Sequence, residues 1–348
     1  MRPVSIRNEC LVNKVIFIDG QPGCGKTLFT SILSTFEKVE IFKFSPEIEN
    51  ICALNYLNKI DNDAALSMLK IQMDLDIYQL MMSRELNFRP TDLSSAYQNP
   101  NLKKYIKRLY FKGDDLVPAK IKKEKPISHY ATHNLLSYSK PIFESFPGKI
   151  FFIEIVRHPI YQVIQQSINH SNWQKKNGTS RQFHIYLKKR AKQYPFWAND
   201  YAEEFINSNN VEKSILDMHY MSLITKKNKK GKLKKYSKNI LTIPFENFVY
   251  SPITYLKKIE KLINSSQTIN TKKELKKQKV PRLKVSDGID LELYKRYGLQ
   301  KSTLGYSELE EIEIRKKIIY KNKIKNKYKI ILDRLISDYN NKNNLSFN

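Results

Sequence analysis

An eight-residue loop near the N-terminus has the clearest chemical meaning in the sequence. Residues 20–27 read GQPGCGKT and satisfy the pattern GxxxxGK[ST], between an apolar run at 14–19 and a helical pattern at 28–36. In such a unit the backbone N–H groups of the loop converge on phosphate oxygens, the helix N-terminus adds partial positive charge, and the lysine supplies a mobile cation. The loop therefore predicts a phosphate-binding site for a nucleotide. The residues expected to contact it are Gly23, Cys24, Gly25, Lys26 and Thr27.

A second buried strand is predicted at 149–156, and two charged residues lie near its end. Glu154 is the kind of carboxylate that nucleotide kinases and ATPases place near magnesium at the end of an apolar strand. Arg157 begins an Arg-His-Pro corner before a helix that is expected to reach about residue 170. The carboxylate favours a magnesium-dependent kinase or NTPase of the P-loop class that uses ATP, whereas the arginine has no evident task in such an enzyme.

The segment 141–159, PIFESFPGKIFFIEIVRHP, resembles the sulfotransferase family. In that family a Phe-Pro turn leads into a strand and an Arg-Asp-Pro corner, whose arginine binds the 3′-phosphate of 3′-phosphoadenosine 5′-phosphosulfate (PAPS). The resemblance implies this role for Arg157. The family has a serine eight residues beyond the corner, where this chain has Gln165. Ser167, two residues further along a helix, would point roughly 200° away, so Gln165 is the expected phosphate contact.

The sequence ATHNLL at 131–136 is similar to the Thr-His-Leu-Pro stretch of cytosolic sulfotransferases. The histidine of that stretch is the catalytic base, so the resemblance gives this role to His133, and Lys26 would assist the transfer. Imidazole also titrates near neutral pH, as a general base requires. His129 is an alternative base if this segment is helical and both histidines face the same cleft.

Two later segments also resemble the family. ILTIPFENF at 240–248 is similar to a strand-and-helix element with a structural role, and Arg282 and Lys284 resemble its late basic phosphate loop. The resemblance implies transfer of a sulfuryl group from PAPS to a hydroxyl or amine. The expected acceptor is a small molecule or a glycan, and no metal ion is expected.

The composition excludes several other classes of protein. Lys and Arg number 61 against 34 Asp and Glu, a formal charge of +27, which would suit a polyanionic partner. No aromatic-and-basic signature of RNA binding accompanies the lysines, so no nucleic acid partner is expected. The three cysteines lack the spacing of a zinc site or a disulfide framework. No apolar run approaches ~20 residues and the N-terminus lacks a signal-peptide core, so we expect a cytoplasmic protein without a membrane span.

These segments predict one α/β domain over residues 1–348, with a P-loop-type parallel sheet flanked by helices. The expected strands are 14–19, 149–156 and 239–244. Residues 40–126 are expected to form a mostly helical inserted lobe, because an amphipathic pattern spans 61–86 and prolines interrupt the rest. Ser307 and Glu310 form a capping box that begins a long C-terminal helix at 307–339.

Overall fold

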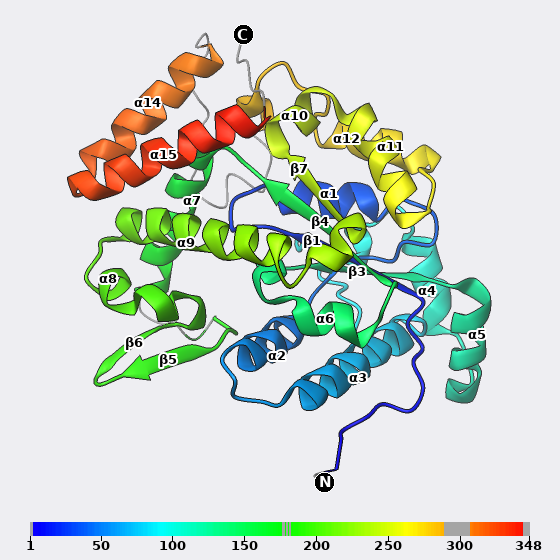
Figure 1. Cartoon of the computed structure of the whole chain (residues 1–348). Coiled ribbons are helices and arrows are strands. Elements are labelled where there is room, and N and C mark those ends of the chain that lie inside the picture. Colours follow the sequence, from blue (N-terminus) through cyan, green and yellow to red (C-terminus); the bar gives the residue numbers. More distant parts are fainter. Residues whose placement is uncertain (1–2, 176–177, 179, 181, 289–306, 344–348) are drawn as a thin grey trace.

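A computed structural model describes residues 3–175, 178, 180, 182–288 and 307–343 (Figure 1). Its centre is a parallel sheet of five strands in the order β2-β3-β1-β4-β7. The strands are β1 (Lys14–Asp19), β2 (Lys43–Phe44), β3 (Ile127–Ala131), β4 (Ile150–Val156) and β7 (Ile240–Pro244). The predicted class, an α/β protein with a parallel sheet flanked by helices, is confirmed.

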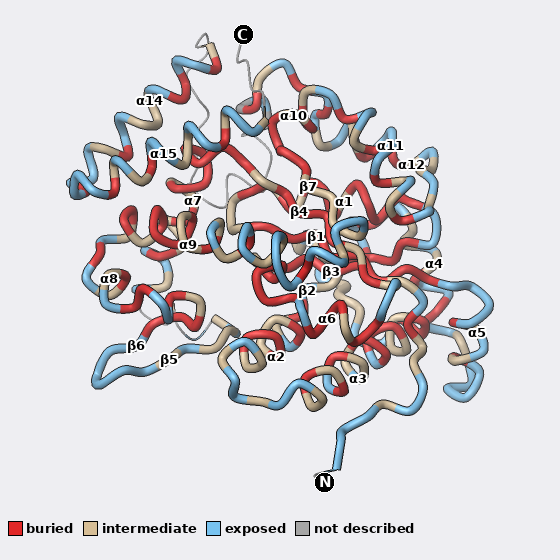
Figure 2. Tube along the Cα trace, viewed as in Figure 1, coloured by how far each residue is buried: buried red, intermediate tan, exposed pale blue. Residues whose placement is uncertain are grey.

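The central strand β1 is buried on both faces because helices cover the sheet on both sides. Val15 and Phe17 point to one face, which is covered by α2 (Pro46–Tyr56), α3 (Asn62–Leu80), α5 (Val117–Glu124) and α6 (Lys140–Ser145). Ile16 and Ile18 point to the other face, as the period of two in a strand requires. Figure 2 shows β1 and β4 drawn mostly as buried residues, whereas much of β7 has intermediate exposure.

The second face of the sheet carries the larger set of helices. They are α1 (Lys26–Leu33), α7 (Pro159–Trp173), α8 (Ala202–Ile206), α9 (Asn210–Lys230), α10 (Phe245–Tyr250), α11 (Pro252–Ile263), α12 (Ile269–Lys277), α14 (Glu308–Lys321) and α15 (Asn326–Asn343). The helix α4 (Leu102–Leu109) lies outside this core, where Tyr105 is buried beside Ile41. Helix α7 packs along α9, and both lie beside the end of the sheet from which the loop 20–27 leaves β1 (Figure 1).

Three features differ from the sequence-based expectation. Residues 40–126 contain the edge strand β2 in addition to helices, and α2 and α3 pack against the sheet as one layer of the core. The expected helix at 307–339 is two helices, because the chain turns between α14 and α15, where Lys323 has φ +52°. The capping box of Ser307 and Glu310 is confirmed at the start of α14.

The strand β3 was also missed, although it pairs with β1 from Lys14 opposite Ile127 to Ile18 opposite Ala131. Its sequence ISHYA contains a serine and a histidine that are both buried, so the apolar pattern of a buried strand is broken. An antiparallel hairpin of β5 (Tyr186–Lys189) and β6 (Lys192–Pro195) lies apart from the main sheet. Across the described part of the chain, no helix has both the length and the apolar character needed to cross a membrane.

Candidate functional site

The loop 20–27 turns tightly between β1 and α1, and two of its glycines have no room for a side chain. Gly20 has φ +143°, and a Cβ there would lie 2.3 Å from the carbonyl oxygen of Ile155. Gly25 has φ +97°, and a Cβ there would lie 2.3 Å from the Phe245 ring. Because glycine alone adopts these conformations without strain, the loop can follow the ends of β4 and β7 closely.

Lys26 and Thr27 are the first two residues of α1, at its positive N-terminal end. The Nζ atom of Lys26 donates hydrogen bonds to the carbonyl oxygens of Gly20, at 2.6 Å, and Gln21, at 3.2 Å. Cys24, in the same loop, is buried. Burial raises the pKa of its thiol, although Lys26 opposes the rise. The loop therefore presents one lysine charge and no thiolate.

Arg157 follows β4 and is buried against the loop. Its Nη1 donates to the carbonyl oxygen of Gly23 at 3.1 Å, and its Nε lies 4.0 Å from Oε1 of Glu246. Its guanidinium carbon lies 4.4 Å from the ring centroid of Phe245 and 5.0 Å from that of Tyr161. The helix α10, which begins with Phe245 and Glu246, thus holds a second positive charge beside the loop.

Glu246 has a structural position in this corner. Its carboxylate accepts hydrogen bonds from the backbone N of His158, at 3.0 Å, and from the hydroxyl of Tyr339 on α15. Burial raises the pKa of Glu246, and Arg157 opposes that rise. The segment 240–248 therefore contacts both the loop and the Arg157 corner, and from this position it can support them.

The loop, the start of α1 and the helix α7 enclose a space of about 140 Å³, which we call the loop cavity. It is lined by Pro22, Gly23, Gly25, Lys26, Thr27, Thr30, Phe44, Ala131, His133, Arg157, Gln165 and Asn169. Lys26 and Arg157 are the charged members, and no Asp or Glu occurs among the described residues that line it. The loop cavity is therefore suited to an anion.

Gln165 lies directly over the loop, because its side-chain oxygen is 3.1 Å from the position of a Cβ on Gly23. Ser167 turns back on its own helix and donates from Oγ to the carbonyl oxygen of Ile164 at 2.7 Å. The geometry thus places Gln165, and not Ser167, in the lining of the loop cavity.

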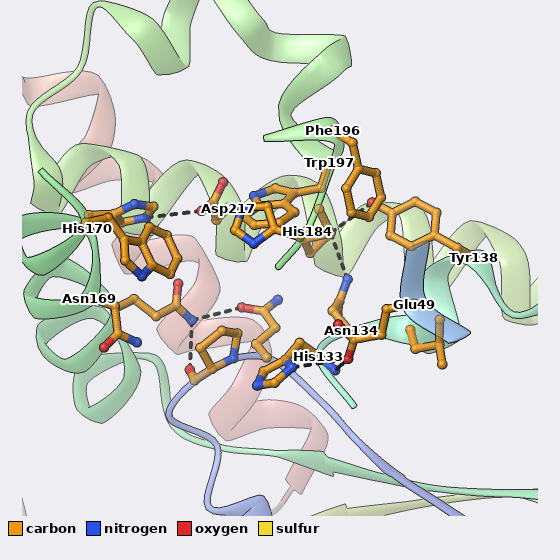
Figure 3. A pocket seen from close by; sticks show the side chains of 16 residues that line it. Glu49, His133, Asn134, Tyr138, Asn169, His170, His184, Phe196, Trp197 and Asp217 are labelled. Carbon is orange, nitrogen blue, oxygen red and sulfur yellow. Dashed lines mark hydrogen bonds and ion pairs between the residues drawn. The ribbon is translucent and has the colours of Figure 1, made fainter. Parts of the chain in front are cut away.

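A second space of about 190 Å³ adjoins the first and is shown in Figure 3. We call it the aromatic cavity. Four Tyr, Phe or Trp rings, three histidine rings and two carboxylates are in its lining, which consists of Gln21, Pro22, Glu49, His133, Asn134, Leu135, Tyr138, Gln166, Asn169, His170, Trp173, His184, Phe196, Trp197, Asp217 and Met221. The two cavities share Pro22, His133 and Asn169. The two cavities therefore meet at the loop 20–27, and His133 lines both of them.

His133 is held from two sides. Oε1 of Glu49 on α2 accepts hydrogen bonds from its backbone N, at 2.7 Å, and from its Nδ1, at 3.1 Å. The ring stacks on Phe44 with centroids 6.3 Å apart. The side chain is nevertheless 49% exposed, so a reacting group can reach it.

Asp19, at the end of β1, fixes the segment that carries His133. Its carboxylate accepts from Thr132 Oγ1 at 2.9 Å and from the backbone N atoms of Leu135 and Leu136 at 2.9 and 2.8 Å. Burial raises the pKa of Asp19, while these hydrogen bonds and Lys26 oppose the rise. Sequence reasoning missed Asp19, although a carboxylate directly before the first loop glycine was visible in the sequence.

His170 and Asp217 lie on another side of the aromatic cavity (Figure 3). His170 Nε2 is 3.2 Å from Oδ2 of Asp217, and the hydroxyl of Tyr201 donates to Oδ1 of Asp217 at 2.6 Å. His184 packs beside them, with its ring centroid 4.6 Å from that of Trp197. Burial lowers the pKa of His184 to about 4, so its imidazole is neutral at pH 7. These residues come from segments without a recognisable motif, so no sequence signal indicated them.

The remaining candidates lie elsewhere. The guanidinium of Arg282 donates to the carbonyl oxygens of Lys279, Val285 and Gln278, each at 3.1 Å, and neither Arg282 nor Lys284 lines either cavity. Their phosphate role stays a prediction. His129 lies in β3, so the helical arrangement that would pair it with His133 is absent. Burial lowers the pKa of His129 to about 3.

Glu154 is engaged by basic and polar neighbours. Its Oε2 accepts hydrogen bonds from Lys229 Nζ and, at 2.6 Å, from Thr242 Oγ1. Lys229 lies near the C-terminal end of α9. Among the residues whose positions are described, no group of three His, Cys, Asp or Glu side chains could hold a metal ion.

Comparisons with known proteins give a distant likeness. No protein-family model matches the chain, and no curated protein sequence matches it. It is similar in structure to the sulfotransferase domain of the Synechococcus PCC 7002 olefin synthase, at 10% identity over 91% of this chain and 98% of that one, with a TM-score of 0.40. It is also similar to sulfotransferase STF9 from Mycobacterium avium, at 10% identity over 98% and 79% of the two chains, with a TM-score of 0.41.

A third similar structure is sulfotransferase STF1 from Mycobacterium tuberculosis H37Rv, at 11% identity over 87% of this chain and 76% of that one, with a TM-score of 0.40. At these identities and TM-scores the likeness does not indicate an activity for this chain.

Proposed function

We propose that this chain is a sulfotransferase that moves a sulfuryl group from PAPS to a hydroxyl or amine of an acceptor. The observation that carries the proposal is the meeting of two unlike cavities at His133. The loop cavity has the positive charges that a phosphosulfate and a second phosphate require, and the aromatic cavity has the apolar surface that an acceptor body requires.

The reaction follows from this arrangement. The acceptor oxygen attacks sulfur, a new O–S bond forms, and the bond from sulfur to the bridging oxygen of the phosphosulfate breaks, which releases adenosine 3′,5′-bisphosphate. The proton of the acceptor passes to Nε2 of His133, because Nδ1–H donates to Glu49 and leaves the lone pair on Nε2. Lys26 and the loop amides stabilise the charge that develops on the leaving oxygen.

The remaining contacts of the donor are assigned by position. Arg157 would hold the 3′-phosphate through its guanidinium, and Gln165 would contact the same region from α7. Lys26 has to leave the carbonyl oxygens of Gly20 and Gln21 to reach the phosphosulfate. Its flexible four-carbon stem permits this movement.

The alternative is a magnesium-dependent kinase or NTPase that uses ATP. It requires a carboxylate near the metal, and Glu154, which lies opposite Asp19 in the register of β4 and β1, is the residue at that position. The ion pair of Glu154 with Lys229 opposes this role, because a bound ammonium competes with a metal ion for the same oxygen. We therefore favour the sulfotransferase.

A thermal-shift titration separates the two functions. Adenosine 3′,5′-bisphosphate should raise the melting temperature without magnesium, because a ligand that binds only the folded state stabilises it. A kinase would instead respond to ATP with magnesium. A shift with ATP and magnesium, and none with the bisphosphate, would overturn the proposal.

A further inference from the structure

The charge of the aromatic cavity is opposite to that of the chain as a whole. The chain has a formal charge of +27, yet none of the described residues that line this cavity is Lys or Arg, while Glu49 and Asp217 are both in its lining. The excess of positive charge on the protein therefore does not extend into the proposed acceptor site.

Both carboxylates act on the interior of the cavity. The negative charges of Glu49 and Asp217 each oppose the lowering of the pKa of His184. Both charges therefore act on this ring, which is part of the lining. Oε1 of Glu49 is occupied by His133, whereas Asp217 lies further along, beside His170. The negative charge is thus present at the reacting end and also away from it.

Aromatic rings lie next to His170, the residue that pairs with Asp217. The ring of His170 is 5.0 Å from that of Trp173, and the ring of His184 is 6.0 Å from Trp173 and 4.6 Å from Trp197. The faces of indole rings attract cations, most strongly where water is excluded. A cavity whose lining holds Asp217 and two indole rings is a suitable environment for an ammonium group.

From these observations we infer that the acceptor carries a positive charge: it is a hydroxylated aromatic amine, with the ammonium beside Asp217, Trp173 and Trp197 and the hydroxyl at His133. This inference rests on the proposed function, because it names the substrate class of the same site. The net positive charge of the protein repels such a ligand from a distance, but salt largely screens this repulsion beyond about 8 Å. The contacts inside the cavity are shorter than that.

The two tryptophans provide a direct measurement. The chain contains only these two, and both line the cavity, so a change in intrinsic fluorescence on addition of a ligand reports this site. Excitation at the red edge of indole absorption avoids the phenolic probes. Three para-substituted phenols of similar shape differ chiefly in the charge at the end of the side chain: tyramine is a cation, para-ethylphenol is neutral, and para-hydroxyphenylpropionate is an anion.

We expect the full-length protein at pH 8 to bind tyramine about 10-fold more tightly than para-ethylphenol, and the anion most weakly. Asp217→Asn keeps an oxygen to accept from Tyr201 and should weaken tyramine about 10-fold while it changes para-ethylphenol by less than about 2-fold. The matched control is Asp338→Asn, because Asp338 is an exposed carboxylate paired with Lys226, outside this cavity. It should leave all three affinities unchanged.

Trp197→Phe is a second variant that keeps an aromatic ring and leaves Trp173 as the reporter. It should weaken tyramine about 3-fold, since the phenyl ring attracts a cation less than indole does. The probe series on the unchanged protein decides the question even if both variants fail to fold. Binding of the neutral or anionic probe as tight as that of tyramine, or no fluorescence response to any probe, would overturn the inference.

The two proposals fail separately. The probe titrations contain no nucleotide and report the aromatic cavity, whereas the bisphosphate melting shift reports the loop cavity. A bisphosphate shift without a preference for tyramine would leave the sulfotransferase proposal standing and remove the cationic acceptor. A preference for tyramine without a bisphosphate shift would leave a cation site and remove the sulfotransferase.

Discussion

The loop cavity and the aromatic cavity share Pro22, His133 and Asn169 but have opposite character. The loop cavity is built by one short motif, the start of one helix and one arginine corner, and its described lining contains cations and no carboxylates. The aromatic cavity collects side chains from α2, α7, α9 and the segments around β5 and β6, and the described residues of its lining include carboxylates and no Lys or Arg. A short motif suffices for an anion, whereas recognition of an acceptor body needs surfaces from distant segments.

The largest expected effect comes from the residue that belongs to both cavities. His133→Ala should retain affinity for adenosine 3′,5′-bisphosphate but lose ~100-fold or more in turnover, because general-base catalysis contributes about 10²–10⁴-fold. Bisphosphate binding and turnover with an accepted hydroxyl compound are to be measured side by side. His129→Gln is the control, since His129 lines neither cavity. Turnover near that of the parent in His133→Ala would eliminate His133 as the base.

The next effect tests the positive charge of the loop cavity. Arg157→Lys keeps the charge but loses the fork of donors, and a charge-assisted hydrogen bond contributes about 1.5–3 kcal/mol, so bisphosphate affinity should fall about 10-fold. Arg157→Ala would also remove packing against Phe245 and Tyr161, so its melting temperature should fall too. Calorimetric titration of the lysine variant measures the affinity. Unchanged affinity would restrict Arg157 to its structural contact with Glu246.

A smaller effect distinguishes two neighbours on α7. Gln165→Ala should weaken bisphosphate binding about 3-fold, because a neutral hydrogen bond contributes about 0.5–1.5 kcal/mol. Ser167→Ala is the matched control and should have no effect, since Ser167 donates to the backbone of its own helix. If the serine variant weakened binding and the glutamine variant did not, the helix would present a different face to the donor.

The smallest effect concerns the pH dependence of the aromatic cavity. The pKa of His184 is lowered to about 4 by burial from the ordinary value of 6.5. Between these values the unfolded chain binds the proton and the folded chain does not, so stability falls as the pH falls from 6.5 towards 4.

His184→Phe should therefore reduce the loss of melting temperature between pH 7 and pH 4.5 by about 2–4 °C. His129 and His158, whose pKa values burial lowers to about 3 and about 4, continue to contribute to that loss in the variant. Thermal unfolding of both proteins at the two pH values measures the difference. An equal loss in the two proteins would mean that His184 takes up its proton in the folded state as well.

The sequence by itself determined the loop at 20–27 and the strands β1, β4 and β7. Each depends on neighbours in the chain: a run of apolar residues is buried on both sides of a parallel sheet, and glycines next to a strand form a turn whatever lies elsewhere. The α/β class follows from the same local patterns.

The tertiary structure alone decided the rest. Strand β3 contains buried polar residues whose partners are distant in sequence, such as Ser34 near His129, so its local pattern does not indicate a strand. Glu49 reaches His133 from 84 positions away, and Asp217 reaches His170 from another helix. The partner of a side chain in the aromatic cavity is fixed by how α2, α7 and α9 pack, and packing depends on the whole core, which no short stretch of sequence specifies.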